Sequence, residues 1–158
     1  MATKAEFYLS LPTKRMAAGV LLFNQEGEVL LVQPTYKETW EIPGGVVERN
    51  ESPKAAVVRE VQEELGLDLS QKEISLVLLD YMGAGDEKTE ALMFIFAGPI
   101  LTPQQQAEIF PFLGEIKSFQ FMHSSEGVAL LGSVLGSRVL RALDAIKAQS
   151  FAYFEGSY

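Results

Sequence analysis

The sequence of 158 residues contains no cysteine. That absence excludes disulfide bonds, thiolate zinc sites and cysteine nucleophiles. It also fits a reducing compartment, so we expect a cytoplasmic protein. Long apolar runs are absent too, since the longest, residues 91–101, is far shorter than the roughly 20 residues that cross a bilayer. Residues 1–15 scatter charge without an apolar core, so we expect neither a signal peptide nor a membrane partner.

Positive charge is scarce, because 13 basic residues stand against 21 acidic ones and the formal net charge is -8. A protein that holds nucleic acid by neutralising phosphates needs a basic surface, so no nucleic-acid partner is expected. An acidic protein that acts on phosphates usually needs a metal cation to bridge the like charges. Hydrophobic residues make up 47% of the chain, which allows a sizeable core, and the length predicts a single domain over residues 1–158.

The order of apolar stretches and turns predicts mixed α/β layers. The stretches with strand character are residues 15–23, 28–33, 74–82, 90–97 and 118–122. The first two are expected to form a hairpin. Pro43 and the two glycines after it are expected to break regular structure. One helix is expected from a cap at Ser52 to about Leu65, ending at Gly66, and an amphipathic helix is expected over residues 133–149.

Three glutamates gather on one side of the first predicted helix. At about 100° per residue, Glu60, Glu63 and Glu64 occupy an arc beside the apolar arc of the helix. Like charges at these spacings destabilise a helix, and Arg59 can pair with Glu63 but cannot serve all three. Such an arc is either a solvated acidic face or a site for a hard divalent cation such as Mg²⁺. The helix alone favours the solvated face.

The segment before this helix favours the cation site instead. Gly44 and Gly45 can bring bare backbone carbonyls close to a ligand. Glu51 lies at the helix start, where negative charge is favoured, and it can reach Arg59 if the loop folds back.

Read together, these residues carry a resemblance to a known family. Gly45, Glu51 and the run at 59–67, REVQEELGL, match the Nudix box of the Nudix hydrolases at every defined position. The box spans residues 45–67, and its nine fixed or restricted positions at one spacing make it a specific signal. The preceding residues 40–45, WEIPGG, resemble the usual approach to that box.

The resemblance implies an α/β/α sandwich around a mixed β-sheet. It also implies hydrolysis of a nucleoside diphosphate linked to another moiety, by water attack on phosphorus with Mg²⁺, or Mn²⁺ as a substitute. The implied metal ligands are the Gly44 carbonyl, Glu60, Glu63 and Glu64, and the three glutamates are also implied to be catalytic. Gly45, Glu51 and Arg59 are implied as structural support, the last two as a pair that fixes the loop against the helix.

The general base varies within the family and often lies outside the box. Glu115, just ahead of the last predicted strand, is the best match, and Glu108 is the second choice. Glu60 is a further alternative. An exposed loop carboxylate explains Glu115 equally well, so the resemblance leaves the base open.

Four side chains outside the box are candidates for substrate contact: Arg15, Tyr36, Lys37 and Trp40. The two cations could meet phosphates and the two rings could stack on a nucleobase, with ordinary surface charge and core packing as the alternatives. His123, the sole histidine, is expected to be a surface or packing residue. The aromatic tail at residues 151–154 either closes the core or forms a homodimer contact.

The leading hypothesis is therefore an active, metal-dependent pyrophosphohydrolase for a small nucleotide. We expect a nucleoside triphosphate or an ADP-ribose-like substrate, although the box itself does not select the leaving moiety. The second hypothesis is a Nudix-fold module that senses a nucleotide without hydrolysing it. A third hypothesis, which ignores the resemblance, is a structural or interaction domain with an acidic helix.

Overall fold

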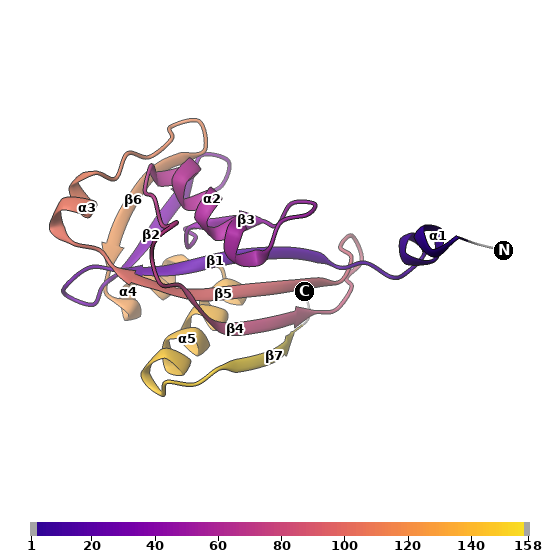
Figure 1. Cartoon of the computed structure of the whole chain (residues 1–158). Coiled ribbons are helices and arrows are strands. Elements are labelled where there is room, and N and C mark those ends of the chain that lie inside the picture. The colour runs from indigo at the N-terminus through magenta and orange to yellow at the C-terminus, as the bar shows by residue number, and fades with distance from the viewer. Residues whose placement is uncertain (1–2, 157–158) are drawn as a thin grey trace.

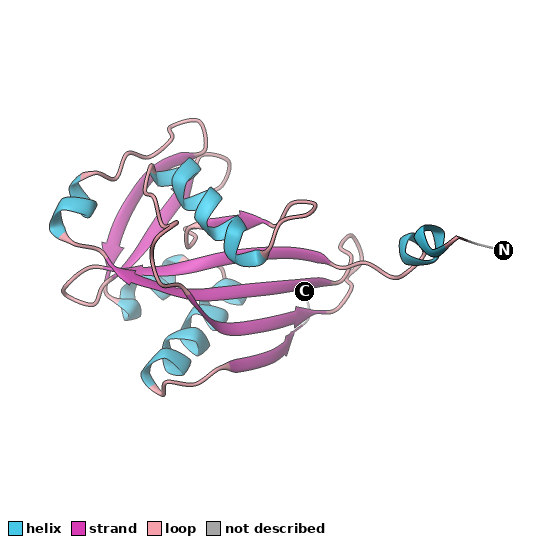
Figure 2. Cartoon of the chain, viewed as in Figure 1, coloured by secondary structure: helices cyan, strands magenta, loops and turns pink. Residues whose placement is uncertain are grey.

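A mixed β-sheet forms the centre of the computed structural model, which describes residues 3–156 (Figures 1 and 2). The strands are β1 (Arg15–Phe23), β2 (Val29–Pro34), β3 (Gly44–Val46), β4 (Ser75–Met82), β5 (Ala91–Ile100), β6 (Ile116–Met122) and β7 (Ala152–Gly156). The helices are α1 (Lys4–Leu9), α2 (Pro53–Leu65), α3 (Pro103–Ala107), α4 (Ser124–Leu130) and α5 (Ser133–Lys147). No helix among the described residues is long and apolar enough to cross a membrane.

The strand order within residues 3–156 is β6-β2-β1-β5-β4-β7, and β3 also pairs with β1. β1 runs parallel to β5 and antiparallel to β2 and β3, while β7 runs parallel to β4. The predicted hairpin of β1 and β2 is confirmed. Because β1 lies in the centre of the sheet, its partner β3 brings Gly44 and Gly45 beside the middle of the sheet.

Helices cover both faces of the sheet (Figure 1). Because successive strand residues point to opposite faces, Val20 and Leu22 of β1 pack in the core under α2, whereas Leu21 packs in the core under α5. Of the apolar arc of α2, Val57, Val61 and Leu65 are fully buried in the first core and Val58 is partly buried against it. Val139 and Ala142 of α5 are buried in the second core. The expected α/β/α sandwich around a mixed sheet is therefore confirmed.

The helix that carries the glutamates has the predicted ends. The Ser52 side chain caps α2 by accepting a hydrogen bond from the Ala55 backbone N–H at 3.1 Å, and Pro53 follows at the first helical position. The helix ends at Gly66, whose φ of 71° is the left-handed conformation that glycine adopts without strain. These local signals fix the length of α2 and hence the placement of its last turn, which contains Glu63 and Glu64.

The predicted break in regular structure is present at Pro43, which lies in a bend outside the strands, but it is wrong for the two glycines, because β3 begins at Gly44 and pairs antiparallel with β1. Gly44 has a φ of 145°, and a Cβ at this position would lie 2.2 Å from the Ala18 carbonyl oxygen. The missing side chain therefore lets the backbone approach β1 closely enough to form a strand.

The aromatic tail forms β7, an edge strand beside β4 that the sequence did not indicate as a strand. Phe151 and Tyr153 stay exposed, whereas Ala152 packs against the core under α5. Only a small part of the tail thus closes the core, and the homodimer contact stays a prediction. The short helices α1, α3 and α4 were not predicted either, since each spans too few residues for a helical period to stand out.

Candidate active site

The loop before α2 is clamped to the helix by an ion pair. Arg59 Nε donates to Glu51 Oε1 at 2.9 Å, and Arg59 Nη2 donates to Glu51 Oε2 at 3.0 Å. Nη2 also donates to the Val46 carbonyl at 3.0 Å, and Glu51 Oε2 accepts from the Glu48 backbone N–H at 2.9 Å. The guanidinium and this N–H hold the pKa of Glu51 below its usual value. One arginine therefore joins α2 to the end of β3 and to the loop that follows it.

Two carboxylates of α2 are aimed at the start of β3. Glu64 is only 8% exposed, and its Oε2 accepts a hydrogen bond from the Gly44 backbone N–H at 3.1 Å. Glu60 lies against Gly45, where a Cβ would stand 2.3 Å from Glu60 Oε1. A side chain at position 45 would therefore displace the Glu60 carboxylate, a contact that the sequence did not reveal.

The surroundings of the buried Glu64 carboxylate disfavour its negative charge. Burial raises the pKa of Glu64 to about 8, and the nearby charges of Glu60, Glu41 and Glu115 act in the same direction. The Gly44 N–H opposes them but does not compensate. A cluster of carboxylates that disfavours its own ionisation is the environment that a bound cation would relieve.

The donor atoms at this cluster fit a hard divalent cation. They are the carboxylate oxygens of Glu60 and Glu64, which both lie against the start of β3, and such cations take oxygen ligands. Arg59 Nη1 donates to Glu60 Oε1 at 2.8 Å and to Glu63 Oε2 at 3.1 Å. The Arg59 guanidinium therefore binds both Glu60 and Glu63. Within residues 3–156, no three acidic, histidine or cysteine side chains are arranged so that they could hold a metal ion together.

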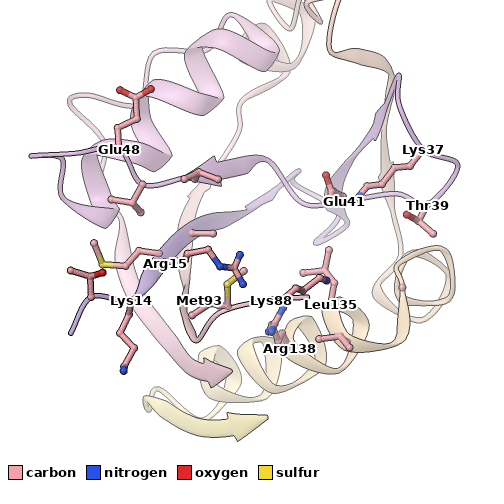
Figure 3. A pocket seen from close by; sticks show the side chains of 18 of the residues that line it. Lys14, Arg15, Lys37, Thr39, Glu41, Glu48, Lys88, Met93, Leu135 and Arg138 are labelled. Carbon is pink, nitrogen blue, oxygen red and sulfur yellow. Dashed lines mark hydrogen bonds and ion pairs between the residues drawn. The ribbon is translucent and has the colours of Figure 1, made fainter. Parts of the chain in front are cut away.

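Two hollows adjoin the carboxylate cluster. A pocket of about 220 Å³ is lined by Gly44, Gly45, Tyr36 and Glu41. A larger cavity of about 1020 Å³ lies beside it (Figure 3). Three of the predicted substrate-contact residues, Arg15, Lys37 and Trp40, line the larger cavity, and Tyr36 lines the smaller one. The four candidates thus line two neighbouring hollows, and Arg15 comes from a different segment of the chain than the other three.

Comparison with known proteins agrees with this geometry. The family model of the NUDIX domain matches residues 13–136. The chain belongs to the Nudix family. The RNA pyrophosphohydrolase of Hydrogenovibrio crunogenus is 39% identical over 56 residues, which cover 35% of this chain and 34% of that protein. The 8-oxo-dGTP diphosphatase of Proteus vulgaris is 42% identical over 35% of this chain and 53% of its own length. This Nudix chain therefore spans about a third to a half of the length of these curated relatives.

A solved structure extends the likeness over most of the chain. The MutT protein from Methanosarcina mazei Go1 matches 89% of this Nudix chain and 99% of its own, with a TM-score of 0.67 at 18% identity. That likeness concerns the fold. Nudix hydrolases generally use divalent metal ions, in agreement with the oxygen donors beside Gly44 in this chain.

The two candidate bases of the Nudix chain that lie outside the box, Glu115 and Glu108, have different surroundings. Glu115 is exposed and close enough to Glu64 for its charge to raise the pKa of that carboxyl. Its backbone carbonyl accepts from the Thr35 N–H at 2.8 Å, which ties it to the loop that carries Tyr36. Glu108 instead ends α3, where its Oε1 accepts from Gln104 Nε2 at 3.0 Å. The structure therefore brings Glu115 to the cluster, and the general-base role stays a prediction.

Two residues of the site, Glu41 and Arg138, were not predicted from the sequence. Glu41 pairs with Lys37 and accepts a hydrogen bond from the Tyr36 hydroxyl at 3.4 Å, so it ties both predicted contacts together. Its position inside WEIPGG was the only available signal. Arg138 of α5 lines both hollows, and nothing in its local sequence marked it. His123 is exposed and within 2.9 Å of the Ser125 hydroxyl, in line with the expected surface position.

Proposed function

We propose that this protein hydrolyses the phosphoric anhydride bond of a nucleoside diphosphate derivative with the help of divalent cations, Mg²⁺ or Mn²⁺. The observation that carries the proposal is the buried Glu64 carboxylate, which faces the Gly44 backbone among other carboxylates and beside an open cavity. A structural acidic face would leave its carboxylates in solvent, because burying a charge without a cationic partner is unfavourable.

The residues of the box divide into ligands and supports. Glu60 and Glu64, with the Gly44 carbonyl and Glu63, would hold the cations, and Arg59 keeps the last turn of α2 aligned with the loop. Bound divalent cations would neutralise the phosphate charge and activate water for attack. An exposed Glu63, with 53% of its side chain accessible, can turn from Arg59 toward a ligand without breaking a buried contact.

The reaction requires a base and room for a leaving group. A water oxygen forms a new bond to phosphorus, Glu115 accepts the proton, and the anhydride P–O bond breaks with its electron pair leaving on the departing phosphate. Glu115 is the preferred base over Glu108 because its charge reaches Glu64. The cavity of about 1020 Å³ is large enough for a nucleoside moiety.

The substrate class follows from the net charge. A net charge of -8 supports a small nucleotide, such as a nucleoside triphosphate or ADP-ribose, over a nucleic-acid polymer. The names of the relatives point both ways, because one is an 8-oxo-dGTP diphosphatase and another is an RNA pyrophosphohydrolase, so the choice rests on the charge. The absence of cysteine supports a cytoplasmic location, and the sheet shared by both cores supports a single domain.

A substrate panel tests the proposal. The purified protein is incubated with Mg²⁺ and nucleoside triphosphates, ADP-ribose and dinucleoside polyphosphates, and released phosphate and pyrophosphate are measured with and without EDTA. We expect metal-dependent turnover of at least one compound, and a Glu64→Gln variant should lose it. A matched Glu73→Gln variant changes an exposed carboxylate and should keep the activity. Tight binding without any product would favour the sensor module instead.

A further inference from the structure

Arg138 is the one basic residue that is buried in the described part of the chain. Its side chain is 9% exposed, and it stands on α5 opposite Asp80 of β4, whose side chain is 2% exposed. Within residues 3–156, the only hydrogen bond of the guanidinium runs from Nε to Asp80 Oδ2. Both terminal nitrogens therefore have no acceptor in the described protein, although a guanidinium offers five N–H donors.

The geometry of the ion pair between Arg138 and Asp80 is unfavourable for stabilising the fold. Asp80 Oδ1 is buried without a hydrogen-bond partner. The guanidinium therefore binds only Oδ2, although an arginine can bind both oxygens of a carboxylate with two parallel hydrogen bonds. A buried pair is in general weak evidence for stability, and unsatisfied polar groups are unfavourable. What this geometry does accomplish is to fix the guanidinium through Nε and leave its terminal N–H groups available to a ligand.

The terminal groups face the hollows next to the box. Arg138 lines both the pocket beside Gly44 and Gly45 and the larger cavity, into which its guanidinium extends from α5 while Arg15 extends from β1 (Figure 3). The cations that line the larger cavity are Lys14, Arg15, Lys37, Arg49, Lys88 and Arg138, against only two carboxylates. In a chain with a net charge of -8, basic residues thus outnumber acidic ones around this cavity, although Lys14 pairs with Glu90 and Lys37 pairs with Glu41.

We propose that the cavity receives the part of the substrate beyond the scissile anhydride and that this part carries its own phosphate group, bound by Arg138. The inference rests on the proposed hydrolase function, because it names the substrate class of that same site. A planar guanidinium matches two phosphate oxygens at once, and a ligand of this charge supplies the acceptors that the terminal nitrogens lack. Asp80 is then a positioning residue that acts through Arg138.

The added phosphate has two chemical sources, which matched ligand pairs distinguish. ADP-ribose is compared with 2′-phospho-ADP-ribose, and AMP with adenosine 3′,5′-bisphosphate, to test a phosphate on the sugar. ADP is compared with ATP to test a longer phosphate chain. Binding is measured by calorimetry in EDTA at low ionic strength, so that no turnover occurs and no metal is required.

The variants separate recognition from folding. Arg138→Met removes the guanidinium but leaves the Asp80 charge buried, which could unfold the protein. The double variant Asp80→Asn/Arg138→Met removes both charges together and guards against this outcome. Arg141→Met is the matched control, because Arg141 lies on the same helix with its guanidinium 3.3 Å from the centre of the Phe154 ring and does not line the larger cavity.

We expect wild type and Arg141→Met to bind the phosphorylated member of at least one pair about tenfold more tightly than its partner. In the double variant, and in Arg138→Met if it folds, this preference should fall to about twofold or less. Equal affinities within every pair, binding too weak to detect for all phosphorylated ligands, or a preference that survives in the double variant would each overturn the proposal. Turnover with Mg²⁺ is scored separately. If the protein prefers the phosphorylated ligands but hydrolyses no compound, the proposed function is rejected and the phosphate site is kept. If it hydrolyses a compound but shows no such preference, the phosphate site is rejected and the proposed function is kept.

Discussion

Replacing Glu64 with glutamine should stabilise the metal-free protein at alkaline pH while removing its metal-dependent activity. Glu64 Oε2 accepts a hydrogen bond from the Gly44 N–H at 3.1 Å, and a glutamine oxygen can accept the same bond. The charge, by contrast, is unfavourable in place, because burial together with Glu60, Glu41 and Glu115 raises the pKa of Glu64 to about 8. The substitution therefore removes the charge and keeps the contact.

The pH dependence has a definite sign. Between the ordinary pKa of 4.5 and the folded value of about 8, the folded protein keeps a proton on Glu64 that the unfolded chain has lost. The free energy of unfolding of the metal-free wild type therefore falls as pH rises through this window. Each pKa unit corresponds to about 1.4 kcal/mol, so the loss is on the order of 5 kcal/mol above pH 8. The loss is absent below pH 4.5, and Glu64→Gln should not have it.

Urea unfolding in EDTA from about pH 5 to about pH 9 measures this difference. We expect the stability of Glu64→Gln to exceed that of wild type by a margin that widens with pH. Glu73→Gln, the same chemical change at an exposed carboxylate, should follow wild type at every pH. Adding Mg²⁺ should stabilise wild type more than Glu64→Gln, because a ligand stabilises the state that binds it. If the difference in free energy of unfolding between Glu64→Gln and wild type stayed constant across the pH range, the raised pKa of Glu64 would be refuted.

Three further substitutions test the geometry of the site through kcat/KM and kcat. Gly45→Ala places a Cβ 2.3 Å from Glu60 Oε1, so kcat/KM should fall about tenfold or more. Gly83→Ala should be silent, because a Cβ there would lie 3.9 Å from the Gly156 carbonyl oxygen, an ordinary contact distance. Arg59→Lys keeps the charge but loses the two-pronged contact with the loop, and kcat/KM should fall about tenfold to a hundredfold with circular dichroism unchanged. Glu115→Gln should lower kcat by about a hundredfold or more and Glu108→Gln should not; equal kinetics of these two variants would reject the assigned base.

The part of the site that lies on α2 could be predicted from the sequence because its signals are local. The cap at Ser52, the stop at Gly66 and the helical period place Glu60 and Glu64 on one side without any knowledge of the sheet. The Arg59 pairing with Glu51 followed from a family resemblance and is present in the structure. Local rules thus position the ligands but not their surroundings.

The remainder depends on contacts between distant segments. Arg138 meets Asp80 across 58 residues of sequence, and no periodicity or motif joins these positions. The strand at Gly44 was missed for the same reason, since its close approach to Ala18 exists only once β1 is in place. Sequence patterns report which face of an element is apolar, whereas these sites depend on which elements become neighbours.

The carboxyl end of α2 is held by the segment that leads to β6. The Phe110 N–H donates to the Leu65 carbonyl and the Phe112 N–H donates to the Glu64 carbonyl, both at 2.9 Å. These two hydrogen bonds join the end of α2 directly to the segment that contains Glu115. The distance between Glu64 and Glu115 is therefore set by direct contact of their two segments, and it does not depend only on β4 and β5, which lie between them in the sequence.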